Sequence, residues 1–277
     1  MQVYRGLDIG TAKPTRSELA DVVHHLVDVA DPDEEWSVQR TQVAVRAGLA
    51  DIEARGKRAI LVGGTGLYVR AVVDDLRIPP TDAAVREALD AAAPDEEGLA
   101  RAFDRLVALD PVAAARMEPG NRRRIVRALE VIELTGRQFS SFGPGIDAYG
   151  PPAISVTMVG VAIEPPVLAT RIASRFATMR DRGLVDEVTA LAGRPLARTA
   201  REAIGYREVL ASLAGEIPLD DAFDAAVRRT RRFARRQRVW FGRDPRVRWI
   251  EGTAPPAVVE AEVAAAWCDV PLSAAAS

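Results

Sequence analysis

The stretch that decides the fold is "LVGGTGLYVRA", residues 61–71, in which an apolar run enters a glycine-rich turn and continues into a helical pattern. A strand that passes through such a turn into a helix presents backbone N–H groups at the helix amino terminus, where anions bind. The turn also carries a hydroxyl, on Thr65. Glycines after a strand are equally common in ordinary tight turns, so this stretch alone leaves both interpretations open.

Neighbouring segments predict a parallel α/β sheet. Apolar runs at 25–31, 58–64 and 153–163 are expected strands, and 37–55 has the apolar period of a helix. The order strand, helix, strand with continuous apolar strands is typical of a parallel sheet covered on both faces. A last short strand is expected at 247–253.

Helix signals alone fill the region between the second and third strands. Asp110 followed by proline, and Asn121 before a basic and apolar run, both have the residue types that begin helices. We therefore expect a helical insertion domain over 76–150, and an α/β core with basic C-terminal helices over 1–75 and 151–277.

Composition excludes several classes of protein. A chain of 277 residues with 48% hydrophobic content can bury a large core. It has no apolar run of membrane length and no secretion leader, so we expect a cytoplasmic protein without a membrane partner. A single cysteine, Cys268, and two histidines, His24 and His25, also predict no metal site built from side chains.

The net charge of −2 conceals two basic segments. Residues 227–249 contain ten arginines interleaved with aromatic residues, and "NRRRIVR", residues 121–127, is a second cluster. One arginine-rich helix is usually only a solvated face, but two separate basic surfaces suit a folded nucleic acid gripped by its backbone. Nearly every basic residue of this alanine-rich chain is arginine. The choice of arginine over lysine is therefore uninformative, and the clustering of the arginines is what indicates a binding surface.

A second loop near the amino terminus, "GLDIGTAKP", residues 6–14, combines an acid at Asp8, a flexible Gly10, the Thr11 hydroxyl and the Lys13 base. It follows Tyr4, which we expect to be exposed. It has an alternative interpretation as a turn before a helix that Thr15 and Glu18 start with a capping box. The two interpretations are compatible, since a cap and a ligand loop use the same geometry. The candidate phosphate-binding residues of both loops are Gly10, Thr11, Lys13, Gly63 and Gly64.

Arg171 and Arg175 are four residues apart in a helical segment and so share one face. Such a pair is usually a solvated edge. Beside a glycine loop, it could instead bind a diphosphate through paired hydrogen bonds.

Eight blocks occur in collinear order and cover nearly the entire chain. They are "MQVYRGLDIGTAKP", "HHLVDVADP", "LVGGTGLYVRA", "DPVAAAR", "NRRRIVRALEV", "R...RF..M...GL..EV", "AIGYRE" and "RRQRVWF". Together they resemble the tRNA dimethylallyltransferases, enzymes that prenylate an adenine beside the anticodon. The resemblance implies a P-loop-kinase-like α/β core with a helical insertion, and nucleotide binding.

The same resemblance implies an activity. A dimethylallyl group passes from dimethylallyl diphosphate, usually with Mg²⁺, to N6 of the adenine next to the third base of the anticodon. The partner is a tRNA anticodon stem-loop whose target base leaves its stack, and we expect the protein to be a monomer.

Individual positions are matched by the resemblance as well. Thr65 matches the family's channel threonine, and Arg175 matches an arginine that contacts the diphosphate. The positions matched to tRNA contacts are Met1, Gln2, Arg86, Arg123, Arg124, Ile125, Val126, Arg127, Ala203, Ile204, Gly205, Tyr206, Arg207, Arg235, Arg236, Gln237, Arg238 and Trp240.

Members of the resembled family begin with a strand, a Gly-Lys-Ser/Thr phosphate loop, a helix and a strand that ends in Asp-Ser, all before the position of Met1. The resemblance makes that aspartate the general base and that loop the main diphosphate contact, and this sequence contains neither. Two explanations stay open. Either the start is placed at an internal methionine of a complete enzyme, or the gene is shortened and its product inactive.

Three functions remain at this point. The first is the prenyl transfer to tRNA. The second is tRNA binding without catalysis, which the basic segments alone would allow. The third is a nucleotide kinase or adenylate prenyltransferase on the same core, for which the insertion and its basic cluster would be surplus.

Overall fold

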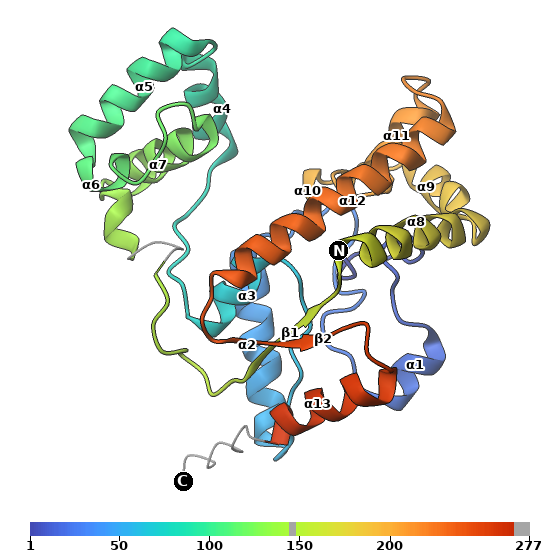
Figure 1. Cartoon of the computed structure of the whole chain (residues 1–277). Coiled ribbons are helices and arrows are strands. Elements are labelled where there is room, and N and C mark those ends of the chain that lie inside the picture. Colours follow the sequence, from blue (N-terminus) through green and yellow to red (C-terminus); the bar gives the residue numbers. More distant parts are fainter. Residues whose placement is uncertain (144–147, 269–277) are drawn as a thin grey trace. The chain divides into compact units, whose positions relative to one another are not determined.

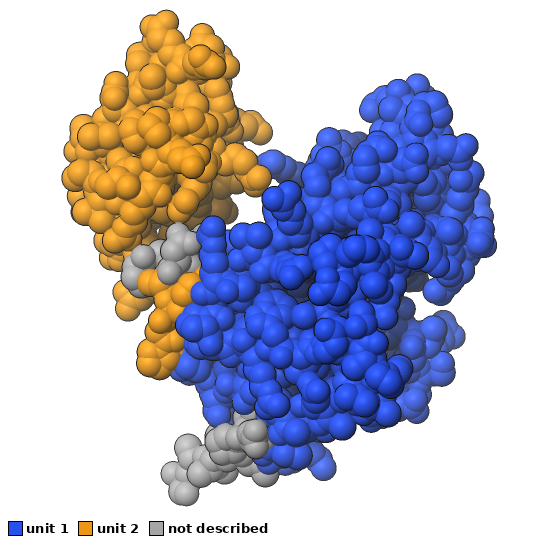
Figure 2. Space-filling view, in the orientation of Figure 1, with its two compact units in different colours: residues 1–73, 152–277 blue, residues 74–151 orange. Residues whose placement is uncertain are grey.

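The computed structural model describes residues 1–143 and 148–268, and it divides the chain into two compact units (Figure 2). Unit 1 comprises Met1–Val73 and Pro152–Ser277, and unit 2 comprises Asp74–Pro151. The chain therefore leaves unit 1 once and returns to it. Within the described residues, no helix has the length and apolar character needed to cross a bilayer.

Unit 1 contains a small parallel sheet of two strands, β1 (Met158–Ala162) and β2 (Val247–Glu251) (Figure 1). Gly160 pairs with Trp249, and a Cβ on Gly160 would stand 2.8 Å from the Trp249 ring, so only glycine lets the indole lie across the strand. Helices and a parallel sheet confirm the predicted α/β class. The strands expected within 153–163 and 247–253 are confirmed with shorter bounds.

The other two expected strands are wrong. Residues 58–64 form no strand, and the Val62 side chain in this run is 88% exposed. An extended run becomes a strand only when the backbone of a neighbouring segment pairs with it, and no such pairing occurs at 58–64. Residues 25–31 contribute one isolated parallel bridge, between Tyr4 and Ala30. Leu26 and Asp28 have φ values of 64° and 55°, and this left-handed backbone interrupts an extended run.

Helices make up most of unit 1. They are α1 (Arg16–Asp21), α2 (Val38–Ala54), α3 (Gly66–Val73), α8 (Pro165–Asp181), α9 (Leu184–Ala192), α10 (Arg198–Arg201), α11 (Tyr206–Leu213), α12 (Leu219–Gly242) and α13 (Pro256–Cys268). The predicted helix at 37–55 is confirmed as α2, where the Ser37 side chain caps the amino terminus by accepting from Arg40 N–H. The capping box of Thr15 and Glu18 is confirmed at α1.

The core of unit 1 lies between α8, α9, α11, α12 and the amino-terminal segment. Leu184 and Val188 of α9 are fully buried there. Tyr4, expected to be exposed, is also fully buried, and its hydroxyl donates to the Glu34 carbonyl at 3.0 Å. The amino-terminal segment is therefore anchored in the core.

Unit 2 is helical, and each of its α-helices begins at a residue whose side chain accepts a backbone N–H. Asp82, Asp95, Asp110 and Asn121 are these caps, and the helix starts predicted at Asp110 and Asn121 are confirmed. The elements are α4 (Ala83–Ala92), α5 (Glu96–Leu109), α6 (Pro111–Ala114), α7 (Arg122–Thr135) and the 3₁₀ helix η1 (Phe139–Phe142). Apolar faces of α4, α5 and α7 enclose a core of their own.

Candidate active site and nucleic-acid interface

The glycine turn at 63–66 is packed directly against the arginine-rich helix α12. The Gln237 amide donates to the Gly64 carbonyl at 2.9 Å. A Cβ on Gly64 would stand 2.0 Å from Gln237 Nε2, and one on Gly66 would stand 1.9 Å from the indole nitrogen of Trp240. These two glycines are required by close approach, and the turn and α12 form one packed structure.

Thr65 lies between these glycines, immediately before α3. Its carbonyl accepts from the backbone N–H of Tyr68 at 2.9 Å and of Val69 at 3.1 Å, as in a first helical turn, while the residue itself is exposed. The hydroxyl therefore lies at the amino-terminal end of α3, where the helix dipole favours an anion. Gly63 is less confined, since a Cβ there would meet Val69 Cγ2 at 3.6 Å.

Arg175 is exposed on α8, at the edge of the stripe of buried residues that includes Ile172 and Phe176. With Arg171 it lines an open depression of about 580 Å³, together with Val167 and three hydroxyl side chains, those of Thr170, Ser174 and Thr178. Two guanidinium groups among hydroxyls make this surface suitable for a phosphorylated ligand. No residue of the glycine turn lines the depression, so Thr65 and Arg175 are placed on separate elements of unit 1.

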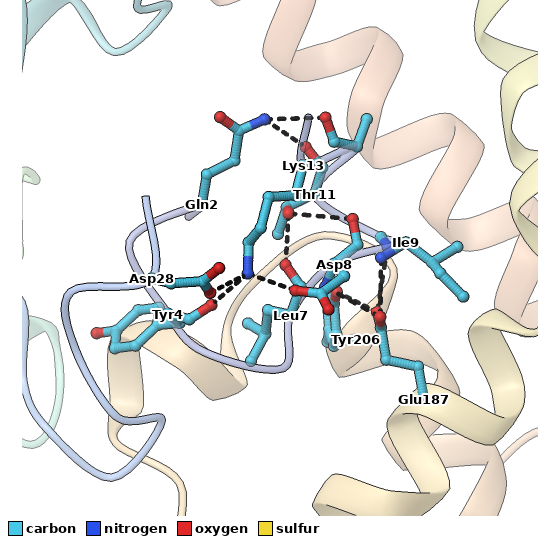
Figure 3. A network of polar contacts seen from close by, with 12 residues as sticks. Gln2, Tyr4, Leu7, Asp8, Ile9, Thr11, Lys13, Asp28, Glu187 and Tyr206 are labelled. Atoms are coloured by element: carbon cyan, nitrogen blue, oxygen red, sulfur yellow. Dashed lines mark hydrogen bonds and ion pairs between the residues drawn. The ribbon is translucent and has the colours of Figure 1, made fainter. Parts of the chain in front are cut away.

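Backbone N–H groups of the loop at 8–13 donate hydrogen bonds to the carboxylate of Glu187 (Figure 3). Glu187 Oε2 accepts from Asp8 N–H at 2.9 Å and Ile9 N–H at 2.8 Å, and Oε1 accepts from Gly10 N–H at 3.2 Å. The Tyr206 hydroxyl also donates to Glu187. The N–H donors near Gly10, which the sequence offered to a phosphate, are bound to Glu187 in this structure.

Lys13 and Thr11 are likewise engaged within the loop. The Lys13 side chain is 5% exposed, and its ammonium binds the carboxylates of Asp8 and Asp28 and the Tyr4 carbonyl, the last at 2.9 Å. The Thr11 hydroxyl donates to the Leu7 carbonyl. In this structure these side chains hold the amino-terminal segment together.

The two amino-terminal positions matched to tRNA contacts lie beside this loop. Gln2 donates its amide to the carbonyls of Thr11 at 3.1 Å and Ala12 at 3.0 Å. Met1 is 45% exposed. The side-chain oxygen of Gln2 therefore remains for another partner.

The outer face of α12 is strongly basic. Arg235, Arg236 and Arg238 are exposed, whereas Gln237 and Trp240, which contact the glycine turn, are half-buried. Helix α12 therefore presents exposed arginines that suit a polyanion, and it also contacts the glycine turn through Gln237 and Trp240.

The segment 203–207 offers few side chains to a partner. Ala203 and Tyr206 are buried, and Gly205 has a φ of +94°, which favours glycine. Ile204 is half-buried, and Arg207 is exposed with a 2.9 Å ion pair to Glu202. Of these matched positions, Arg207 presents the largest polar group at the surface.

In unit 2, residues 123–126 of helix α7 lie partly at the surface and partly in the core. Arg123 and Arg124 are exposed, whereas Ile125 and Val126 are 0% and 3% exposed and pack in the core of the unit. The side chains of Ile125 and Val126, which the resemblance matched to tRNA contacts, are thus enclosed by their own unit. Because a helix turns 100° per residue, consecutive positions cannot all face one partner.

A buried carboxylate organises two further arginines of unit 2. Glu130 is fully buried and binds Arg86 at 2.7 Å and Arg127 at 2.8 Å, while Asp82 N–H donates to it at 2.9 Å. Burial alone would raise the pKa of Glu130, but the hydrogen bonds from Arg86 and Arg127 outweigh it and hold that pKa below its ordinary value. Glu130 therefore stays ionised and fixes both guanidinium groups.

Sequence reasoning missed both organising carboxylates. Glu130 follows Arg127 by three positions on α7, a spacing that indicates an ion pair and could have found it. Glu187 accepts from backbone groups 177 to 179 positions away, and no pattern of side chains signals such a contact.

Comparisons with known proteins identify the family of this chain. The family model "IPP transferase" matches residues 2–244. A tRNA dimethylallyltransferase of Bifidobacterium longum (strain NCC 2705) is 46% identical over 269 residues, which are 97% of this chain and 80% of the relative. The tRNA dimethylallyltransferase of Streptomyces coelicolor is 48% identical over 254 residues, 91% of this chain and 80% of the relative.

Solved structures extend the comparison. The tRNA isopentenylpyrophosphate transferase of Bacillus halodurans is 36% identical, with a TM-score of 0.66, over 96% of this chain and 85% of that one. A eukaryotic dimethylallyltransferase acting on tRNA has a TM-score of 0.76 over 99% of this chain and 73% of that one; at 22% identity it supports the fold alone. The predicted resemblance is confirmed, and the chain belongs to the IPP transferase family.

Proposed function

We propose that this protein transfers a dimethylallyl group from dimethylallyl diphosphate to tRNA, at N6 of the adenine next to the third base of the anticodon. Family membership over residues 2–244 and relatives at 46 to 48% identity support the prenyl transfer to tRNA. The nucleotide kinase alternative gains no support, because the relatives are tRNA-modifying enzymes.

The observation that carries the proposal is the packing of α12 on the glycine turn. Gln237 and Trp240 fix the turn that carries Thr65, while Arg235, Arg236 and Arg238 of the same helix are exposed. A polyanionic substrate held by these arginines would therefore approach the candidate site of chemistry. A nucleotide kinase has no need for such a surface.

The reaction needs few groups from the protein. The N6 lone pair attacks the allylic carbon, the carbon–oxygen bond breaks, its electron pair leaves with the diphosphate, and the alkylated N6 releases one proton to solvent water. We assign Arg175 to the diphosphate, since a guanidinium pairs with phosphate oxygens and stabilises the charge that develops there. We assign Thr65 to the end of the channel at which the adenine meets the donor.

Recognition of tRNA is assigned to basic surfaces on both units. On unit 1 these are the exposed arginines of α12, with Gln2 and Arg207, and on unit 2 they are Arg123 and Arg124, with Arg86 and Arg127 held by Glu130. Their contacts to phosphates make binding weaken steeply as salt rises. The target adenine would leave its stack to be read, at a cost that these backbone contacts offset.

The Mg²⁺ that the resemblance implies finds no protein site in the part of the chain described. No group of three His, Cys, Asp or Glu residues there could hold a metal ion. Mg²⁺ at such sites commonly binds through substrate phosphates with only one or two carboxylates, so the diphosphate would supply most of its ligands.

The test uses an anticodon stem-loop and labelled dimethylallyl diphosphate in the presence of Mg²⁺. We expect label to enter the stem-loop with adenine, and none to enter a matched stem-loop in which purine, which lacks the N6 amino group, replaces it. Tight binding of both without label would contradict the transferase and favour a tRNA-binding protein without catalysis. A monomeric mass in light scattering, with and without stem-loop, is expected in the same samples.

A further inference from the structure

The carboxylate of Glu187 has an unusual number of donors for a group at the protein surface. Three consecutive backbone N–H groups, of Asp8, Ile9 and Gly10, and the Tyr206 hydroxyl all donate to it (Figure 3). Hydrogen bonds to an ionised acceptor are about twice as strong as neutral ones. The loop is therefore fixed at one end by a single side chain of α9.

The packing around this contact leaves little freedom. A Cβ on Gly10 would stand 2.4 Å from Tyr206 Cε2, so the tyrosine ring lies directly on the loop. Burial raises the pKa of Tyr206, as do its hydrogen bond to Glu187 and the charge of Glu187. The hydroxyl therefore remains a donor at any working pH. On the other side, Leu184 and Val188 place Glu187 by anchoring its helix in the core.

The other end of the same loop holds Gln2. Between the ends, Lys13 N–H donates to the Asp8 carbonyl at 2.9 Å and Ala12 N–H donates to the Ile9 carbonyl at 3.0 Å, so the loop is a closed turn. Ala12 has a φ of 49°, a conformation that costs free energy in a residue with a Cβ and persists only when its surroundings impose it. In that conformation, the carbonyls of Thr11 and Ala12 both accept from the Gln2 amide.

We propose that Glu187 is a positioning residue for tRNA recognition, which fixes the 8–13 loop through its backbone and thereby sets the position of Gln2. The proposal rests on the proposed function, in which Gln2 contacts the tRNA. Glu187 itself touches no substrate; it acts through the loop. Its contribution is to hold Gln2 in one place before the tRNA arrives, which removes an ordering cost from binding.

The test compares four variants of the full chain. Glu187→Gln keeps the size of the side chain but turns an acceptor pair into one acceptor and one donor, which opposes the N–H groups of the loop. Asp186→Asn is the matched control, because it makes the same change on the same helical turn at an exposed residue. Gln2→Ala and the double variant Gln2→Ala with Glu187→Gln complete a cycle.

Two measurements are made on each variant. The first is the dissociation constant of the anticodon stem-loop at fixed salt; we expect Glu187→Gln to raise it about tenfold, and Asp186→Asn to leave it unchanged. The double variant should bind no more weakly than Gln2→Ala, since the two residues act in series. The second is amide hydrogen exchange, which should quicken over residues 8–13 in Glu187→Gln and stay unchanged in Asp186→Asn.

Several outcomes would overturn the inference. Unchanged stem-loop binding in Glu187→Gln, with faster exchange in the loop, would make Glu187 a purely structural anchor. Additive losses in the double variant would show that Glu187 does not act through Gln2. Absence of stem-loop binding by the unsubstituted chain would contradict the proposed function itself, and this inference with it, and so is distinguishable from a failure confined to Glu187.

Discussion

Trp240 of α12 lies against Gly66 at the start of α3 so closely that a Cβ on Gly66 would stand 1.9 Å from its indole nitrogen. Gln237 has the same relationship to Gly64, at 2.0 Å, and donates to its carbonyl. One helix thus carries both the exposed arginines and the side chains that shape the glycine turn. A substitution that disturbs the contact between α12 and the glycine turn should therefore weaken both tRNA binding and dimethylallyl transfer.

Gly66→Ala tests that contact. The added methyl must push Trp240 aside, and overpacking of this kind costs about 1 to 3 kcal/mol of the free energy of unfolding. We expect the variant to lose that stability in urea denaturation and to transfer dimethylallyl more slowly. Gly63→Ala is the control, because its Cβ would meet Val69 at an ordinary 3.6 Å. Equal losses in both variants would refute the role of the Trp240 contact.

Glu130→Gln should destabilise unit 2. It removes the charge that compensates Arg86 and Arg127 in a fully buried position, and we expect a cost of about 3 kcal/mol. Hydrogen exchange of peptides from 74–151 in the full chain measures this loss. Glu133→Gln, which breaks a more exposed pair with Arg105, should cost less than about 1 kcal/mol. If the two costs are alike, the Glu130 network is not what holds the unit.

The same carboxylate predicts a pH dependence. Because the folded-state pKa of Glu130 is below its ordinary value of 4.5, the unfolded chain takes up the proton first as pH falls. The stabilisation is therefore complete above the ordinary pKa, declines below it and is lost as pH falls through the folded-state pKa. Protection of 74–151, corrected for intrinsic exchange rates, should decline accordingly, and less so in Glu130→Gln. An identical pH profile for both proteins would disprove the assignment.

Arg124→Ala and Arg175→Ala should separate the two substrates. Arg124 is exposed on α7, and its loss should weaken stem-loop binding and reduce the slope of log affinity against log salt by about 0.9 per phosphate contact. Arg175→Ala should instead raise the KM for dimethylallyl diphosphate. Arg101→Ala, another exposed arginine of unit 2, should change neither. The division of roles fails if both variants affect both substrates equally.

Helices of this chain could be predicted because their signals are local. Asp110 and Asn121 are found at helix starts, and Gly136 after α7 has a φ of 65°, as a helix-ending glycine requires. Each of these signals depends on a few neighbouring residues. The starts and ends of these helices can therefore be predicted from the residues at their boundaries.

Two of the expected strands and several site contacts could not be predicted in this way. The run at 58–64 has a strand's composition, but pairing depends on a neighbour that composition does not name. The prediction that Tyr4 is exposed is wrong because the residues that bury it lie on helices far along the chain, which the local sequence does not reveal. The Glu187 contact likewise joins a side chain to distant backbone N–H groups. Only the fold brings these groups together.

The most direct test of the central claim is the mass of the nucleosides released from an anticodon stem-loop after incubation with this chain, dimethylallyl diphosphate and Mg²⁺. The proposed function predicts the gain of one C₅H₈ unit on the adenosine next to the third anticodon base and on no other nucleoside. A stem-loop that is bound by the protein but recovered with every nucleoside at its original mass would contradict it.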